Sequence, residues 1–133
     1  SGRFINFSMI KNKLKNRKDS FEITRKFSSL NVRQKFLNER SGRQDEIISK
    51  DDFKEIIFKD CFYCKTNWTS INLDTGTKFN GIDRVDSSKG YIKGNIVPCC
   101  AYCNVGKAEL SIKDFYRMIA RITKKHCRRF ISS

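Results

Sequence analysis

The sequence predicts an α+β fold, in which a small core of short strands and one helix is held by a four-cysteine metal site and flanked by helices. All six cysteines of the 133-residue chain follow residue 60, and four of them form two Cys-x2-Cys pairs. Short extended segments lie between the pairs, and segments with helical periodicity lie on both sides. A hydrophobic content of 38% and a charged content of 32% argue against a membrane protein and against a fully disordered chain.

Residues 1–48 are expected to form a basic N-terminal helical arm. Ile10 and Leu14 stand four residues apart in a stretch that carries five Lys or Arg and no acid, which predicts a short helix over residues 8–18. A second helix is expected over residues 31–40. The residues between these two helices are polar and weakly patterned.

Residues 49–133 are expected to form the domain proper, beginning with a capped helix. Ser49 and Asp52 have the spacing of a capping box, and Phe53 and Ile57 recur at helical spacing. This helix should run to about residue 59 and lead into the first cysteine pair.

Extended structure is expected between the cysteine pairs. Residues 67–72 and 78–84 read as strands joined by a turn at residues 73–76, and residues 96–98 read as a short strand because Pro98 disfavours a helix there. Trp68 is expected in the core, as is Phe62.

Two further helices should follow the second cysteine pair. The first covers residues 101–109, and the second opens at the capping box formed by Ser111 and Asp114. An apolar stripe on the second helix has a period of 3.6 residues and is expected to face the core: Ile112, Phe115, Ile119 and Ile122. A basic tail follows it.

The two cysteine pairs, separated by 35 residues, have the spacing of a structural zinc site: Cys61, Cys64, Cys100 and Cys103. Cys99 is an alternative to Cys100, and Cys127 has no assigned role. A disulfide framework is disfavoured because the cysteines are clustered, lysine is abundant and no secretory signal is recognisable. A reducing compartment, cytoplasmic or nuclear, is therefore expected.

The net charge of +14 predicts a polyanionic partner, most often a nucleic acid. An anionic membrane surface is the competing partner, but the basic segments lack a clear apolar face, and no apolar run is long enough to span a membrane. The expected nucleic-acid-binding residues are Lys11, Lys13, Lys15, Arg17, Lys18, Lys107, Lys124, Lys125, Arg128 and Arg129.

Residues 81–107, GIDRVDSSKGYIKGNIVPCCAYCNVGK, resemble the core of the HNH (ββα-metal) endonucleases. The similarity is greatest to the subgroup in which Asp-Arg replaces the usual Asp-His, which includes rare-cutting restriction enzymes. A zinc-bearing phage endonuclease that resolves branched DNA has the same order of cysteine pairs, Asp and Asn. The resemblance covers about residues 50–110. It implies a ββα-metal core, divalent-metal-dependent hydrolysis of duplex or branched DNA and a viral or phage-type role.

The resemblance also implies site residues. Asp83 and Asn104 would hold a catalytic Mg²⁺ or Mn²⁺ through oxygen atoms, and Arg84 would hold the phosphate in place of the usual histidine. Asn95 would brace the loop that follows the first strand. Tyr63 is the candidate general base. His126, the one histidine in the sequence, is a weaker candidate, and a water molecule activated by the metal or the phosphate is the remaining option.

Two other functions stay open. The chain could be a zinc-stapled nucleic-acid-binding module that has lost cleavage with the change to Arg84, or a targeting subunit of a DNA-processing assembly. Retention of both Asp83 and Asn104 favours the enzyme, because a binding module has no need of two metal ligands. Cutting both strands would favour a homodimer.

Overall fold

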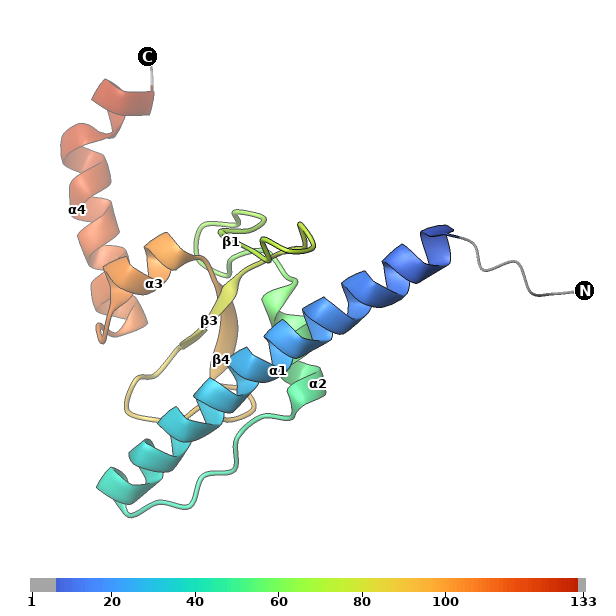
Figure 1. Cartoon of the computed structure of the whole chain (residues 1–133). Coiled ribbons are helices and arrows are strands. Elements are labelled where there is room, and N and C mark those ends of the chain that lie inside the picture. Colours follow the sequence, from blue (N-terminus) through green and yellow to red (C-terminus); the bar gives the residue numbers. More distant parts are fainter. Residues whose placement is uncertain (1–6, 132–133) are drawn as a thin grey trace, which may run out of the picture.

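The computed structural model describes the backbone of residues 7–131 and the side chains of residues 7–126. Figure 1 shows two long helices at different sides of a small α+β core. No described helix is long and apolar enough to cross a membrane. The elements, in chain order, are α1 (Phe7–Ser41), α2 (Lys50–Ile57), β1 (Ser70–Ile71), β2 (Lys78–Phe79), β3 (Gly81–Arg84), β4 (Ile96–Cys99), α3 (Ala101–Lys107) and α4 (Ile112–Ile131).

The centre of the fold is a ββα unit made of β3, β4 and α3. Strands β3 and β4 pair in antiparallel register, with Asp83 opposite Val97 and Gly81 opposite Cys99. Helix α3 follows β4 after Cys100 and packs against β3. The separate pair of short strands, β1 and β2, is also antiparallel. The strand predicted at residues 96–98 and the helix predicted after the second cysteine pair are confirmed.

Residues 8–18 and 31–40 are helical as expected, but they belong to one continuous helix of 35 residues, so the expectation of two separate short helices is wrong. The connecting stretch is helical because its apolar side chains pack on the core. Ile23 and Leu30 are buried in one cluster with Phe53 and Ile57 of α2. No glycine or proline interrupts residues 7–41. Tertiary packing can therefore stabilise a helix in a segment whose own amphipathic pattern is weak.

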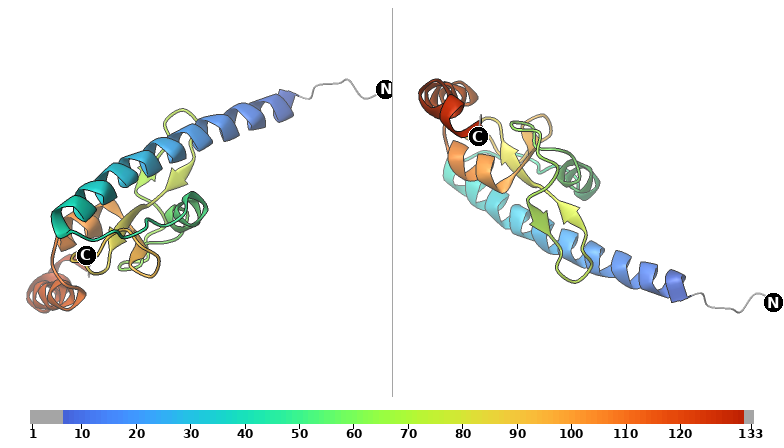
Figure 2. Two further views of the ribbon diagram at one scale, coloured as in Figure 1. Left: turned by 90° about the horizontal axis from the view of Figure 1, so that it is seen from below. Right: turned by 90° about the horizontal axis from the view of Figure 1, so that it is seen from above.

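Helix α1 contacts the rest of the protein closely from about Asp19 onward. Figures 1 and 2 show the N-terminal half extending beyond the core, and its apolar side chains, such as Phe7 and Leu14, are exposed. This projecting half carries the five basic residues of the predicted arm.

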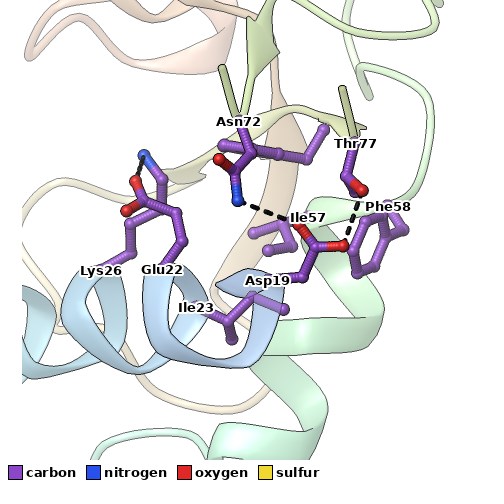
Figure 3. A pocket seen from close by; sticks show the side chains of 9 residues that line it. Asp19, Glu22, Ile23, Lys26, Ile57, Phe58, Asn72 and Thr77 are labelled. Atoms are coloured by element: carbon purple, nitrogen blue, oxygen red, sulfur yellow. Dashed lines mark hydrogen bonds and ion pairs between the residues drawn. The ribbon is translucent and has the colours of Figure 1, made fainter. Parts of the chain in front are cut away.

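A cluster of hydrogen bonds fastens α1 to the β1–β2 hairpin (Figure 3). The Asp19 carboxylate accepts hydrogen bonds from Asn72 Nδ2 at 2.9 Å and from Thr77 Oγ1 at 2.6 Å. It also accepts one from Thr75 Oγ1 at 2.5 Å. Burial alone would raise the pKa of Asp19, but these three hydrogen bonds and the charge of Lys15 outweigh it and hold the pKa below its usual value. The ionised carboxylate therefore latches the helix to the hairpin loop.

The predicted helix caps are present. Ser49 Oγ accepts a hydrogen bond from the Asp52 N–H at 3.0 Å, and Ser111 Oγ accepts one from the Asp114 N–H at 3.1 Å. Helix α2 ends at Ile57, two residues earlier than expected.

Four residues that were expected in the core are exposed instead. On α4, Phe115 is buried, but Ile119 and Ile122 are about half exposed, because only the first turns of α4 pack against the core. Trp68 and Phe62 are each 40% exposed. Lys78 Nζ lies 4.6 Å from the centre of the Trp68 ring, so the rings cover the surface and are not part of the interior.

Candidate active site

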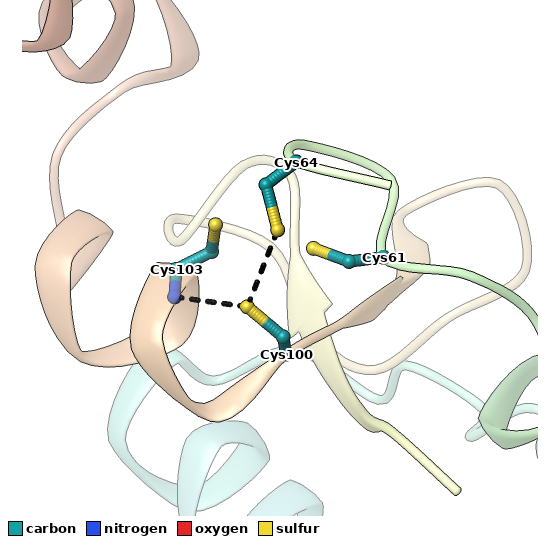
Figure 4. A group of neighbouring side chains, drawn as sticks. All are labelled: Cys61, Cys64, Cys100 and Cys103. Atoms are coloured by element: carbon teal, nitrogen blue, oxygen red, sulfur yellow. Dashed lines mark hydrogen bonds between the residues drawn. The ribbon is translucent and has the colours of Figure 1, made fainter. Parts of the chain in front are cut away.

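Four cysteine side chains converge between the loop after α2 and the start of α3 (Figure 4). Their sulfur atoms all lie within 4.8 Å of one another, and those of Cys64 and Cys100 are 3.6 Å apart. Thiolates about 2.3 Å from one tetrahedral Zn²⁺ would be roughly 3.8 Å apart, so the cluster has the size and chemistry of a zinc site. Its members are those predicted: Cys61, Cys64, Cys100 and Cys103.

Local backbone geometry brings the sulfurs together. Cys100 is the N-cap of α3, and its Sγ accepts a hydrogen bond from the Cys103 N–H. In the first pair, the Lys65 N–H closes the turn onto the Cys61 carbonyl, and Lys65 adopts the left-handed φ of 65°. Each pair is therefore held by a tight turn.

Cys61 has a lowered pKa, whereas burial raises the pKa of Cys100 and Cys103 in the same cluster. Burial alone would raise the pKa of Cys61, but backbone N–H groups of Cys100 and of its own loop outweigh it and lower the pKa to about 6. This favours the thiolate, the form in which cysteine binds metals. Cys99 is buried and its Sγ donates to the Cys100 carbonyl, so Cys100 and not Cys99 belongs to the cluster. The side chain of Cys127 lies outside the described residues.

Asp83 on β3 lies next to the cysteine cluster, between the first cysteine loop and α3. Its Oδ2 accepts a hydrogen bond from the Tyr63 hydroxyl at 2.6 Å and lies 3.1 Å from the ammonium of Lys107. Oδ1 makes no hydrogen bond to a described residue, and no buried side-chain oxygen in the described part of the chain lacks a partner. The small exposed area of Asp83, 7%, must therefore include Oδ1. One oxygen is held from inside, and the other makes no hydrogen bond to a described residue.

Lys107 is completely buried, which contradicts its predicted contact with phosphate. Its ammonium donates to the Arg84 carbonyl at 3.0 Å in addition to its ion pair with Asp83. If the Lys107 side chain turned outward to reach a phosphate, the buried carboxylate of Asp83 would lose its positively charged partner.

Tyr63 is brought to Asp83, as the predicted site requires, but as a hydrogen-bond donor. Its ring packs edge-on against Phe115 and Tyr116 of α4. Burial, and then the neighbouring carboxylate of Asp83, raise the pKa of the phenol far above its usual value. A role as general base would require the bond to Asp83 to be broken.

Arg84 and Asn95 hold the loop between β3 and β4. The Arg84 guanidinium donates to the carbonyls of Ser87 and Lys89 and lies 5.1 Å from the centre of the Tyr91 ring. No hydrogen bond or ion pair joins it to Asp83 in the described chain. The phosphate contact predicted for Arg84 thus stays a prediction.

Asn95 makes the bracing contacts expected of it. Its side chain is buried, accepts a hydrogen bond from the Asp86 N–H at 2.9 Å and donates to the carbonyls of Asp86 and Gly90. The side chain therefore fixes the loop that follows the strand bearing Asp83.

Asn104 is exposed on α3, one helical turn before Lys107 and on the same face of the helix. It lines an open groove of about 280 Å³ together with Gly81 and Ile82, the two residues that precede Asp83. The opposite wall is α1, which contributes three cations and no acid: Arg25, Lys26 and Arg33.

The cations of this groove were missed by the sequence analysis. Arg25 and Lys26 share an ion pair with Glu22, whereas Arg33 has no hydrogen bond or ion pair with any described residue. Arg25 or Lys26, Ser29 and Arg33 recur at helical spacing, and this spacing is the sequence signal from which the basic face could have been predicted. Recognising it requires the knowledge that α1 is continuous.

The other predicted nucleic-acid-binding residues lie at the two ends of the molecule. Lys11, Lys13, Lys15, Arg17 and Lys18 are exposed on the projecting half of α1. Lys124 and Lys125 are exposed on α4, as is His126, while the side chains of Arg128 and Arg129 lie outside the described residues. The structure therefore does not gather the two basic clusters into one patch.

Comparison with known proteins gives a structural relative for this arrangement. The chain superposes on the rare-cutting HNH restriction endonuclease PacI with a TM-score of 0.50, 19% identity and coverage of 80% of each chain. The protein has an HNH-like fold.

Comparison at the level of sequence identifies a partial match to a viral protein and no family. No protein-family model matches the chain. Uncharacterized protein R423 of Acanthamoeba polyphaga mimivirus is 31% identical over 75 residues, which are 56% of this chain. The matched segment is only 13% of the length of that viral protein, so the chain corresponds to a small part of it.

Proposed function

We propose that the protein is a metal-dependent endonuclease that hydrolyses DNA phosphodiester bonds. The observation that carries the proposal is the carboxylate of Asp83, which is fixed through Oδ2 and open at Oδ1. It stands in a ββα unit whose helix carries Asn104 one turn before Lys107, the residue whose ammonium contacts Asp83. The HNH-like fold and the +14 charge support the same function.

The donor set suits a hard divalent cation. Asp83 Oδ1 makes no hydrogen bond within the described part of the chain, and Asn104 is exposed on the neighbouring helix, so a carboxylate and an amide oxygen are available. Mg²⁺ and Mn²⁺ prefer such ligands and keep coordination positions for water and phosphate. When bound, the cation would polarise the scissile phosphate and stabilise the negative charge of the leaving oxygen.

The remaining residues position this pair. The Tyr63 phenol and the Lys107 ammonium orient the carboxylate of Asp83, while Asn95 holds the following loop. The cysteine cluster, filled with structural zinc, fixes Cys103 and therefore the next residue, Asn104. Holding the ligands in place in this way favours catalysis, because little reorganisation is needed during the reaction.

The groove between α1 and β3 is the proposed path of a DNA strand to the site. Arg33 and Arg25 would contact phosphates on one side while Asn104 stands on the other. The projecting half of α1, with its five exposed cations, would extend this contact along the duplex.

Cleavage of a supercoiled plasmid tests the proposal. The zinc-loaded protein should nick or linearise the plasmid with Mg²⁺ or Mn²⁺ and not with EDTA, and Asp83→Ala should abolish cleavage. Asp114→Ala, which changes an exposed carboxylate on α4, is the matched control and should cleave normally. No cleavage of duplex, single-stranded or branched DNA with either ion would refute the enzyme.

One observation favours the alternative of a binding module. Asp83 already has a cationic partner in Lys107, and Arg84 is engaged by loop carbonyls, so neither group is wholly free for phosphate chemistry. Tight DNA binding by a wild-type protein that cuts no substrate would establish this alternative.

A further inference from the structure

Lys107 is a buried charge that the proposed reaction does not itself require. It is the only lysine with no solvent exposure among residues 7–126, and its ammonium contacts Asp83 Oδ2 and the Arg84 carbonyl. Burying an ammonium is costly unless the partners are well placed. A solvent-facing side chain would be the ordinary outcome for a lysine in the last turn of a helix.

We propose that Lys107 is a resident counter-cation of Asp83, which limits the affinity of the site for a divalent ion until DNA is bound. The inference rests on the proposed function, because it takes Asp83 as the ligand of that ion. It assigns to Lys107 a positioning and regulating role and no contact with the substrate.

The ammonium of Lys107 lies close to the place where the ion would bind. The ammonium is 3.1 Å from Oδ2, so an ion bound at Oδ1 of the same carboxylate would lie within a few ångströms of a positive charge. Like charges at such a separation repel strongly where water is scarce, and Lys107 is completely buried. The lysine therefore weakens binding of the ion while it keeps the carboxylate in position.

DNA changes this balance. A phosphate that binds to the ion beside Asn104 adds a negative charge close to the two cations, which offsets their repulsion. Binding of the ion and binding of DNA are then linked, and each increases the affinity of the site for the other. Free divalent ion would occupy the site weakly in the absence of DNA.

A merely structural role for Lys107 predicts the opposite effect of its removal. If the lysine only supported the fold, its loss would disorder Asp83 and weaken the binding of the ion. If it is a counter-cation, its loss strengthens that binding. The direction of the change therefore separates the two roles.

The experiment measures Mn²⁺ binding to the zinc-loaded protein without DNA, by the electron paramagnetic resonance signal of free Mn²⁺. Lys107→Met removes the charge, and Lys107→Gln removes the charge but keeps N–H donors for the Arg84 carbonyl. Both variants should bind Mn²⁺ at least about tenfold more tightly than wild type. Lys113→Met, at an exposed lysine of α4, is the matched control and should bind as wild type does.

Equal or weaker Mn²⁺ binding by either variant, in protein that retains zinc and circular dichroism, overturns the inference. A second measurement needs no variant: a short duplex should tighten Mn²⁺ binding by wild type at least about tenfold, after the ions bound by duplex alone are subtracted. Equal affinity with and without duplex also overturns the inference. If wild type binds no Mn²⁺ in either condition, or Asp83→Ala binds as wild type does, the proposed function itself fails.

Discussion

Asp19 provides the sharpest test of how α1 is held on the core. The substitution Asp19→Asn removes the negative charge and turns one carboxylate oxygen into an amide that cannot accept a hydrogen bond. The hydrogen bonds that three side chains of the β1–β2 hairpin donate to the carboxylate are then weakened or lost: those of Asn72, Thr75 and Thr77.

The magnitude follows from these bonds. A hydrogen bond to a charged group contributes about 1.5–3 kcal/mol, so three would contribute up to roughly 9 kcal/mol in a dry interior. Asp19 is partly exposed, however, and water screens its charge and competes for its donors. We expect Asp19→Asn to lower the free energy of unfolding by about 1–2 kcal/mol, measured by urea denaturation of the zinc-loaded protein at pH 7.

The pH dependence gives an independent check. The pKa of Asp19 is lower in the folded protein than in the unfolded chain, so its stabilisation is fully present above the unfolded value, about 3.9. The stabilisation is lost as the pH falls through the folded pKa. The difference between wild type and Asp19→Asn should therefore shrink below about pH 4.

Asp74→Asn, an exposed carboxylate in the same hairpin loop, is the control and should change the free energy of unfolding by less than about 0.5 kcal/mol at pH 7. If Asp19→Asn were no more destabilising than Asp74→Asn, or if its effect did not depend on pH, the latch described above would be refuted.

Three further predictions concern the site. Arg33→Ala should weaken duplex binding severalfold and lower the slope of log affinity against log salt by about one, measured by fluorescence anisotropy. An unchanged slope would contradict the proposal that a DNA strand lies in the groove. Tyr63→Phe should reduce cleavage at fixed Mg²⁺ by about 10- to 100-fold. Excess Mg²⁺ should restore cleavage if the phenol only orients Asp83. Loss of cleavage at every Mg²⁺ concentration would indicate that Tyr63 is the general base. Cys103→Ser should abolish zinc binding, measured by elemental analysis, and unfold the ββα unit, measured by circular dichroism. Retained zinc would contradict the assignment of the four cysteines as zinc ligands.

The local features of the fold could be predicted from sequence because each depends on few neighbouring residues. The Cys-x2-Cys pairs form tight turns on their own, a serine three residues before a carboxylate caps a helix, and Pro98 excludes a helix at its position. These rules located α2, β4, α3 and the start of α4. Asn95 could be assigned its bracing role from the resemblance because the loop around it matches the motif.

Features that depend on distant packing could not be predicted. Residues 19–30 show no clear amphipathic pattern, and they are helical in the structure because Ile23 and Leu30 pack on α2. Lys107 looks like a surface lysine, since its burial depends on a carboxylate 24 positions earlier in the chain. Ile119 has the spacing of a core residue but lies beyond the part of α4 that meets the core.

The placement of the catalytic cation is the central claim, and anomalous X-ray diffraction tests it most directly. Crystals of the zinc-loaded protein soaked in Mn²⁺ should show, besides a zinc peak among the four cysteine sulfurs, a second peak about 2.1 Å from Asp83 Oδ1 and within coordination distance of the Asn104 amide oxygen. A well-ordered site with no manganese beside Asp83, or with manganese bound only elsewhere, would contradict the account.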